Sequence, residues 1–554
     1  MEHGNLGPEM TDGFGIAKRY SVLTGVLLFV FSLVYFFPYV KVLHRIGDEG
    51  TLVYGAQLVA QGALPYRDFF EVMGPGAFYW LGLFFKMFGT NIIVARAVLL
   101  LTATLTIILL YWMTRRIYQG PFGILPSLFY LIISFPSWPG TNHHWDSNLF
   151  GLLAVGAFFL WQGQRRWWFL ALAGVLTGLT SCFIQQRGLF LVLALALVIL
   201  VNGHRAGEAK PRIVYHIGIL LGCYAAVGGI VFWFFYLSGG LSDLIYSNLI
   251  WPLTRYQNVN RVPYGYGLTV FYYGHWRQVL QGLFSAPVSQ TLALLTVAPL
   301  GLILCLPFLL IGLGGVSCLN ASHRAKIFNA ALLPYWAAGF ALWISEFHRR
   351  DIVHLIYGSP LLIVLLFVIC SYYLNNQRLI KSLVVGLITC CLILFGSLNA
   401  LTMLSANQKI VTRRGILYGF KEDTALKFLI EHTKPGEYAF IYPYYPMYYF
   451  IADVKNPTRY SILLYNINTE AQFNEVIKNL EQKQVKYVLW DTLVAGSNIK
   501  IWFPQYEHPP KENQQLEQYL KDHYQLIDIL NGFKIMRLRS EKRAPGTDFS
   551  TSQR

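Results

Sequence analysis

Long apolar runs separated by short polar connections dominate the first 404 residues of the chain. A run of roughly 20 apolar residues is long enough to cross a bilayer as a helix. A shorter apolar run, Pro75 to Phe88, carries Lys86 and is expected to lie in the membrane interface. We therefore expect a polytopic α-helical membrane protein with about eleven spans, near residues 20–42, 91–113, 121–136, 147–161, 167–184, 188–202, 213–237, 288–313, 328–346, 354–372 and 379–402.

After residue 404 the pattern changes to that of a small soluble α/β domain, expected over 405–540, followed by a disordered tail at 541–554. Asn531-Gly532 is a strong hairpin turn signal between the last two expected strands. The expected strands are Tyr438–Tyr442, Lys486–Trp490, Gln525–Leu530 and Phe533–Leu538, and the expected helices are Glu422–His432, Glu470–Gln482 and Lys511–Asp522.

Composition and charge agree with a membrane protein. The 554 residues are 55% hydrophobic and 13% charged, whereas a soluble protein carries about 25% charged residues. The net charge of +16 fits the positive-inside rule, because each short inner connection is basic when the N-terminus is cytoplasmic. No basic stretch is interleaved with exposed aromatic residues, which excludes nucleic acid as a partner. The seven cysteines fall mostly in apolar segments, so no disulfide framework is expected.

With about eleven spans and a cytoplasmic N-terminus, the C-terminal domain is expected on the extracytoplasmic side. The chain lacks an organelle retention signal, which favours a prokaryotic inner or plasma membrane.

An acidic pair, Asp48-Glu49, lies in the expected first outer loop, 43–90, just past the first span. Charges at the edge of a bilayer are costly to bury and usually serve binding or chemistry. A carboxylate here can act as a general base on an acceptor hydroxyl or can bind a metal ion. The alternative is helix capping, which explains one acidic residue more readily than two. Both residues are therefore candidate catalytic residues.

Further acidic residues and imidazoles occur in the first outer loop and in the second, which joins the third and fourth expected spans. Asp146, in the second outer loop, is a third catalytic candidate, although it also suits the N-cap of the following span. Glu71, His143 and His144 are the residue types that bind a divalent metal ion, so such an ion is a candidate cofactor. The alternative for Glu71 is an ordinary solvated carboxylate.

Arginines on the expected outer face break the positive-inside rule and are candidates for binding an anion. His348, Arg349 and Arg350 form one cluster, and Arg255 and Arg261 lie in the long outer loop, 238–287. The planar fork of arginine suits phosphate. The alternatives are snorkelling toward lipid head groups and a place in an aromatic interface belt.

The opening 160 residues resemble the GT-C glycosyltransferases, and among them the group of protein O-mannosyltransferases and aminoarabinose transferases. These membrane enzymes use lipid-phosphate-linked sugars. The residues that carry the resemblance are Asp48-Glu49, Tyr54-Gly55-Ala56-Gln57, Gly62, Pro65-Tyr66, Phe70-Glu71, Pro75, Tyr79-Trp80, Phe88-Gly89, Ala95-Arg96 and Asp146, with a soluble outer domain after the last span.

The resemblance implies roles for three of these residues. Asp48 matches the acidic residue proposed as catalytic, Glu71 matches a position that can contact metal, and Asp146 matches the acid of the second loop. Aminoarabinose transferases often have a lysine directly after the matching glutamate, whereas Val72-Met73 follows here. Neutralising the donor phosphate then falls to other cations, with Lys86, Arg96, Arg349 and Arg350 as candidates.

The expected function is transfer of a sugar from a polyprenyl-phosphate donor in the bilayer to an acceptor hydroxyl on the extracytoplasmic face, with inversion and with Asp48 as general base. One alternative is a transporter or flippase for a lipid-linked saccharide, although transporters usually show repeated halves and polar groups near the midplane. Another is a ligase or polymerase that uses diphosphate-linked glycans. The sugar and the acceptor are left open.

Overall fold

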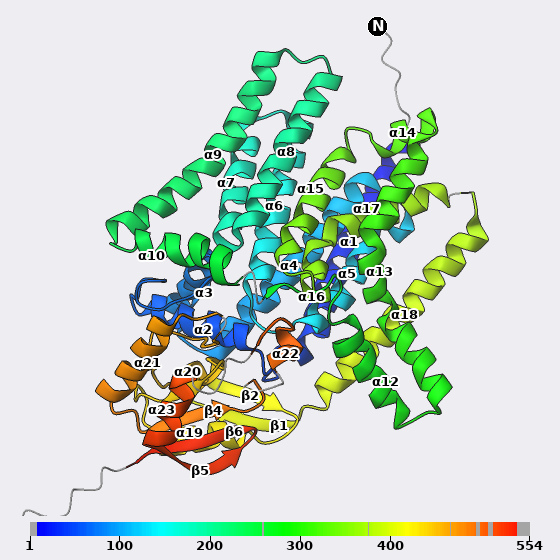
Figure 1. The fold of residues 1–554 in the computed structure, drawn as a ribbon. Helices are drawn as coiled ribbons and strands as arrows, with labels where there is room; N and C mark the ends of the chain where they lie inside the picture. Colours follow the sequence, from blue (N-terminus) through cyan, green and yellow to red (C-terminus); the bar gives the residue numbers. More distant parts are fainter. Residues whose placement is uncertain are drawn as a thin grey trace, which may run out of the picture.

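A computed structural model describes residues 8–256, 260–374, 376–465, 467–494, 499–507 and 514–539. The chain forms a bundle of long helices with a small α/β domain at one end (Figure 1). The first helix, α1 (Pro8–Val40), runs from the far end of the bundle toward this domain. The first turns of α1 and the C-terminal domain therefore lie at opposite ends of the bundle.

Each expected apolar run forms a helix or a broken helix. Pro360 marks a bend of 69° between α16 (Ile352–Gly358) and α17 (Pro360–Tyr373), since a proline cannot continue the hydrogen bonding of the preceding turn. The remaining helices of the bundle are α4 (Ile92–Ile117), α5 (Leu125–Ser137) after the short η1 (Pro121–Ile124), α6 (His143–Gln164), α7 (Trp167–Phe183), α8 (Gln185–Arg205), α9 (Lys210–Leu237), α13 (Ala286–Cys318), α15 (Leu333–Ser345), α16 (Ile352–Gly358), α17 (Pro360–Tyr373) and α18 (Arg378–Leu404).

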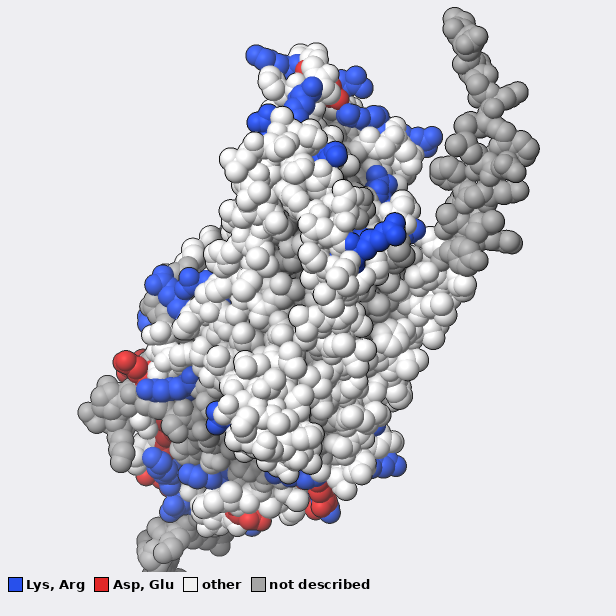
Figure 2. All heavy atoms as spheres, turned by 90° about the vertical axis from the view of Figure 1, so that its right-hand side faces the viewer, with Lys and Arg blue, Asp and Glu red and all other residues white. Residues whose placement is uncertain are grey.

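Six helices of the described chain are long and apolar enough to cross a membrane, namely α1, α4, α8, α9, α13 and α18, and the broken pair α16–α17 makes a seventh. The chain is an integral membrane protein by this measure. The expected number of eleven spans stays a prediction. Figure 2 shows that the middle of one face carries few charged side chains, between a group of Lys and Arg at the upper end and mixed charges at the lower end.

Short helices form several of the connections between the long helices. The first outer loop contains α3 (Pro75–Phe88), which has the bounds expected of the interfacial helix, and α2 (Gly47–Ala60), where no helix was expected. The long outer loop contains α10 (Leu241–Ile245), η2 (Tyr246–Ile250), η3 (Pro252–Tyr256), η4 (Leu268–Tyr273) and α12 (Gly274–Gln281). Two further short helices lie later in the bundle, α14 (Ala321–Ile327) before α15 and η5 (Glu346–His348) after it.

The C-terminal domain contains the four expected strands as one sheet of order β3-β4-β6-β5. Asn531 and Gly532 have positive φ values of 49° and 79°, as a tight hairpin between β5 and β6 requires. A second, two-stranded sheet of β1 and β2 was not expected. The strands are β1 (Gln408–Thr412), β2 (Gly415–Gly419), β3 (Phe440–Tyr442), β4 (Tyr487–Asp491), β5 (Tyr524–Leu530) and β6 (Phe533–Leu538), and the helices are α19 (Thr424–His432), α20 (Met447–Ile451), α21 (Glu470–Gln482), α22 (Ile499–Trp502) and α23 (Gln515–His523).

The helices expected at 422–432 and 470–482 are present as α19 and α21. The helix expected over Lys511–Asp522 is present as α23, which begins at Gln515. Residues 511–513 and the expected tail at 541–554 lie outside the described residues. All seven cysteines are free, as expected for a chain without a disulfide framework.

The C-terminal domain packs directly on α2. A Cβ at Gly50 would lie 2.1 Å from the backbone nitrogen of Met447, and a Cβ at Gly47 would overlap the ring of Tyr444. These glycines, which flank the acidic pair in the sequence, let the segment before α20 approach α2 closely. An ion pair of 2.8 Å between Arg45 and Asp491 adds a further contact between the two parts.

Candidate functional site

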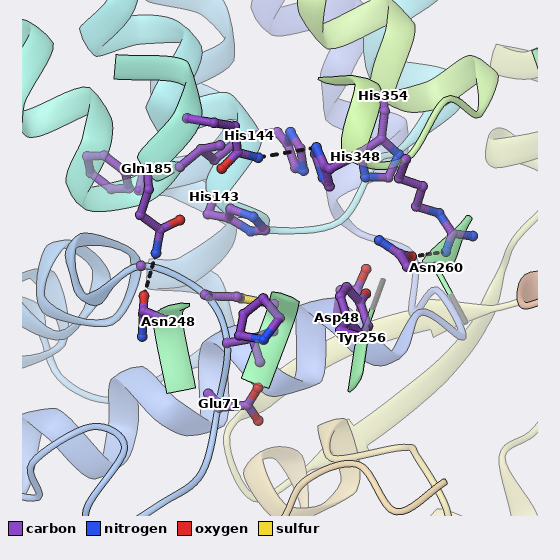
Figure 3. Close-up of a pocket in the computed structure, with 18 of the residues that line it drawn as sticks. Asp48, Glu71, His143, His144, Gln185, Asn248, Tyr256, Asn260, His348 and His354 are labelled. Carbon is purple, nitrogen blue, oxygen red and sulfur yellow. Dashed lines mark hydrogen bonds between the residues drawn. The ribbon is translucent and has the colours of Figure 1, made fainter. Parts of the chain in front are cut away.

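A cavity of about 1270 Å³ lies between the helical bundle and the C-terminal domain. One part of its wall is apolar and comes mainly from α8, α9 and the helices of the long outer loop, with Leu189, Phe190, Val231, Phe232, Leu249 and Leu253. The other part is polar and includes Asp48, Glu71, His143, His144, Asn248, Asn260, His348, Arg349, His354 and Tyr444. Figure 3 shows the histidines on the wall facing Asp48 and Glu71. The cavity therefore offers an apolar groove that continues into a polar pocket.

Asp48 lies in the first turn of α2, is half-buried and lines the cavity. Its carboxylate accepts a hydrogen bond from the hydroxyl of Tyr444, which comes from the C-terminal domain. Burial and the neighbouring Asp48 raise the pKa of Tyr444 well above its ordinary value, so this phenol remains a donor. Asp48 thus already contacts a hydroxyl group at the cavity wall.

Glu49 points away from the cavity and is fully buried. One carboxylate oxygen lies 2.8 Å from a guanidinium nitrogen of Arg96, and the other accepts a hydrogen bond of 2.9 Å from the Thr141 N–H. Arg96 also donates to the carbonyls of Val42 and Pro139. Neither residue lines the cavity. The two residues expected to have catalytic and phosphate-binding roles thus form a buried ion pair away from the cavity.

Glu71 lines the cavity below the histidines and is 5% exposed. Burial raises the pKa of Glu71 to about 8, and the Asp48 carboxylate acts in the same direction against hydrogen bonds from Ser461 and the Val72 N–H. At pH 7 this carboxyl group is therefore mostly protonated.

Four histidine rings lie next to one another on the opposite wall. The ring centroids are 4.6 Å apart for His143 and His144, 4.9 Å for His144 and His354, and 5.4 Å for His348 and His354. The metal ligands expected from the sequence, Glu71, His143 and His144, are not brought together as one set. Among the described residues, the group with ligand atoms within 4.8 Å of one another is His144, Glu346 and His354.

Arg349 lines the cavity, but its guanidinium already has several partners. It forms an ion pair of 2.6 Å with Asp351 and donates to the Asn260 side chain and the Trp502 carbonyl. Burial favours the neutral form of Asp351, yet His354 and Arg349 hold the pKa of this carboxyl below its ordinary value. Arg349 is thus a fixed positive charge at the wall.

The other residues expected to bind or react do not line the cavity. Asp146 is buried in the first turn of α6, where its carboxylate accepts a bond of 3.4 Å from the Thr102 hydroxyl. The remaining four are exposed and lie elsewhere: Lys86, Arg255, Arg261 and Arg350.

Sequence reasoning missed Tyr444 and Glu346. Glu346 has a sequence signal, because it is a charge at the end of an apolar run and such charges are usually paired or functional. Its partner is Arg187, a fully buried arginine in the first turn of α8. Tyr444 has no comparable signal, since only the folding of the C-terminal domain brings it to Asp48.

Comparisons with solved structures report similar folds. The oligosaccharyltransferase AglB from Archaeoglobus fulgidus, in complex with an inhibitory peptide and a dolichol-phosphate, matches with a TM-score of 0.50 and 14% identity over 95% of this chain and 75% of that chain. An oligosaccharyltransferase structure from the same organism, with zinc and sulfate, has a TM-score of 0.49 and 14% identity over 90% and 71%. ArnT from Cupriavidus metallidurans, bound to undecaprenyl phosphate, has a TM-score of 0.38 and 14% identity over 94% and 99%.

No protein-family model matches the chain, and no curated protein sequence matches it. At 14% identity the likeness to AglB concerns the fold. That fold agrees with the resemblance seen in the opening 160 residues. The chain therefore has the fold of the GT-C glycosyltransferases.

Proposed function

We propose that this protein is a membrane glycosyltransferase that moves a sugar from a polyprenyl-phosphate donor to an acceptor hydroxyl, with Asp48 as general base. The fold supports a glycosyl transfer, and the oligosaccharyltransferase of the same fold is described with a dolichol-phosphate, a lipid of the same class. The shape of the cavity supports a donor that combines a long apolar tail with a polar head.

The observation that carries the assignment of the base is the state of the four carboxyl groups lining the cavity, Asp48, Glu71, Asp351 and Asp491. Asp491 is paired with Arg45, and Asp351 is paired with Arg349. Glu71 is held mostly protonated by burial. Asp48 has no ion-pair partner among the described residues and accepts a hydrogen bond from a hydroxyl group.

The reaction needs no further acid. The acceptor oxygen attacks the anomeric carbon, its proton passes to Asp48, and the bond between the anomeric carbon and the phosphate oxygen breaks with inversion. The leaving group is a phosphate monoester, which is stable as an anion. The Arg349 guanidinium at the wall stabilises the charge that grows on the phosphate.

Sugar transfer by the purified full chain in detergent tests the proposal. A panel of radiolabelled polyprenyl-monophosphate sugars serves as donor and a membrane extract as acceptor. We expect transfer by wild type, none by Asp48→Asn, and wild-type rates for Asp68→Asn, which changes an exposed carboxylate of the same loop outside the cavity. Transfer by Asp48→Asn, or transfer only from diphosphate-linked glycans, would contradict the proposal.

A further inference from the structure

His144, Glu346 and His354 come from three separate helical segments, α6, η5 and α16, and meet at one point beside the cavity. Each offers one ligand atom, and these atoms lie within 4.8 Å of one another. Glu346 is fully buried, and His144 is 7% exposed. His144 and His354 also line the cavity, so the cluster opens toward it.

Two polar atoms of the cluster are buried without a hydrogen-bond partner, Oε2 of Glu346 and Nδ1 of His144. They are 3.6 Å apart, which is too long for a hydrogen bond. Two ligands that each lie about 2.0–2.1 Å from a tetrahedral zinc ion are roughly 3.3 Å apart. The spacing therefore suits two ligands of one ion better than a direct contact.

Local sequence explains how the segments approach. His354 and Gly358 are four residues apart in α16 and share one helix face. A Cβ at Gly358 would lie 3.0 Å from Cγ of Glu346, so glycine allows this face to come close to the carboxylate. The ring of Tyr357 stacks on His144 at 4.9 Å and fixes its plane.

His354 and Glu346 are each oriented by a contact with a residue outside the cluster. Nδ1 of His354 lies 2.7 Å from Oδ1 of Asp351, and with this nitrogen as the donor the Nε2 lone pair is free to bind a metal ion. Carboxylate, histidine and metal in this order is a common arrangement around protein-bound zinc. Oε1 of Glu346 is taken by Arg187, which leaves Oε2 for an ion.

We propose that His144, Glu346 and His354 bind one divalent transition-metal ion of the zinc class. Two histidines and one glutamate are a ligand set that zinc uses when its fourth position stays open. Here two of the three ligands, His144 and His354, line the cavity. A further part of the inference rests on the proposed function: the open position accepts an oxygen of the donor phosphate, on the wall opposite Asp48.

Metal binding is measured directly and needs no substrate. The full chain is purified in detergent without a histidine tag, stripped with a chelator, and titrated with Zn²⁺ or Co²⁺. We expect one bound ion per chain by mass spectrometry of the metal, and a visible spectrum of four-coordinate cobalt. His354→Ala should weaken binding by about 100-fold or more, since loss of an outer partner alone costs roughly 10–100-fold.

His348→Ala is the matched control, because this histidine lies beside His354 but outside the ligand set. Glu346→Gln is avoided as the main test because it leaves Arg187 buried without its counter-charge. A folded wild-type protein that binds neither ion would overturn the metal site. Equal losses in His354→Ala and His348→Ala would also overturn it.

A polyprenyl monophosphate added to the cobalt-loaded protein tests the phosphate contact. We expect a shift in the cobalt spectrum. An unchanged spectrum with the ion still bound would overturn the phosphate contact alone. A failure of sugar transfer, by contrast, leaves the metal content unaffected, so the proposed function and the metal site are judged separately.

Discussion

Replacing Glu49 by glutamine should damage the stability of the protein, although its neighbour Asp48 is the candidate base. Glu49 is fully buried and its side chain faces Arg96, whose side chain is 5% exposed. Glutamine keeps the size of the side chain but removes the charge, so the Arg96 guanidinium loses its counter-ion. Removing one partner of a buried pair costs about 3–5 kcal/mol.

That cost is large beside the about 5–15 kcal/mol that separates folded from unfolded states of typical proteins. We therefore expect Glu49→Gln to lower the apparent melting temperature by several degrees in the same detergent, as followed by the loss of monodisperse protein on heating. Asp48→Asn, one residue away, should melt like wild type and yet transfer no sugar.

The double variant Glu49→Gln, Arg96→Met separates charge from packing. It removes both charges, and replacing a whole buried pair by apolar side chains is often close to neutral, so it should melt higher than Glu49→Gln alone. If Glu49→Gln melts like wild type and has lost sugar transfer, Glu49 belongs to the chemistry and the structural role is refuted.

Three further changes test other contacts. Gly50→Ala places a Cβ 2.1 Å from the backbone nitrogen of Met447, so it should destabilise the docking of the C-terminal domain by about 1–3 kcal/mol or more. The effect should appear as faster protease cleavage between the helical bundle and the C-terminal domain, and unchanged cleavage would count against the contact. In the folded protein Glu71 stays protonated up to about pH 8, whereas in the unfolded chain it loses its proton near pH 4.5. The contribution of Glu71 to the stability of the fold is therefore complete below pH 4.5 and is lost as the pH rises to about 8. Between pH 5 and 8.5 the melting temperature of Glu71→Gln should therefore fall less steeply with pH than that of wild type. Parallel profiles of melting temperature against pH would refute the raised pKa of Glu71. Tyr444→Phe removes the phenol hydroxyl that occupies Asp48 where the acceptor hydroxyl would bind, so the KM for the acceptor should fall about 10-fold. A loss of kcat at saturating acceptor would show instead that the phenol positions the base.

The sequence allowed prediction of those features that depend on local patterns. Apolar runs predicted the positions of the long helices, and Asn531-Gly532 predicted the hairpin of the C-terminal sheet. The number of membrane crossings could not be settled in this way, because short apolar helices such as α5 and α7 are below the length of an ordinary span. The helix α2 was missed because its sequence, rich in glycine and tyrosine, does not show an amphipathic period.

By itself the sequence determined a membrane protein with acidic residues at one end of its helices and a soluble domain after them. Only the tertiary structure separated Asp48 from Glu49, because consecutive residues of a helix point about 100° apart and so meet different neighbours. One faces Tyr444 from the C-terminal domain, and the other faces Arg96 from α4. The same holds for His144, Glu346 and His354, whose shared point exists only where three segments distant in sequence pack together.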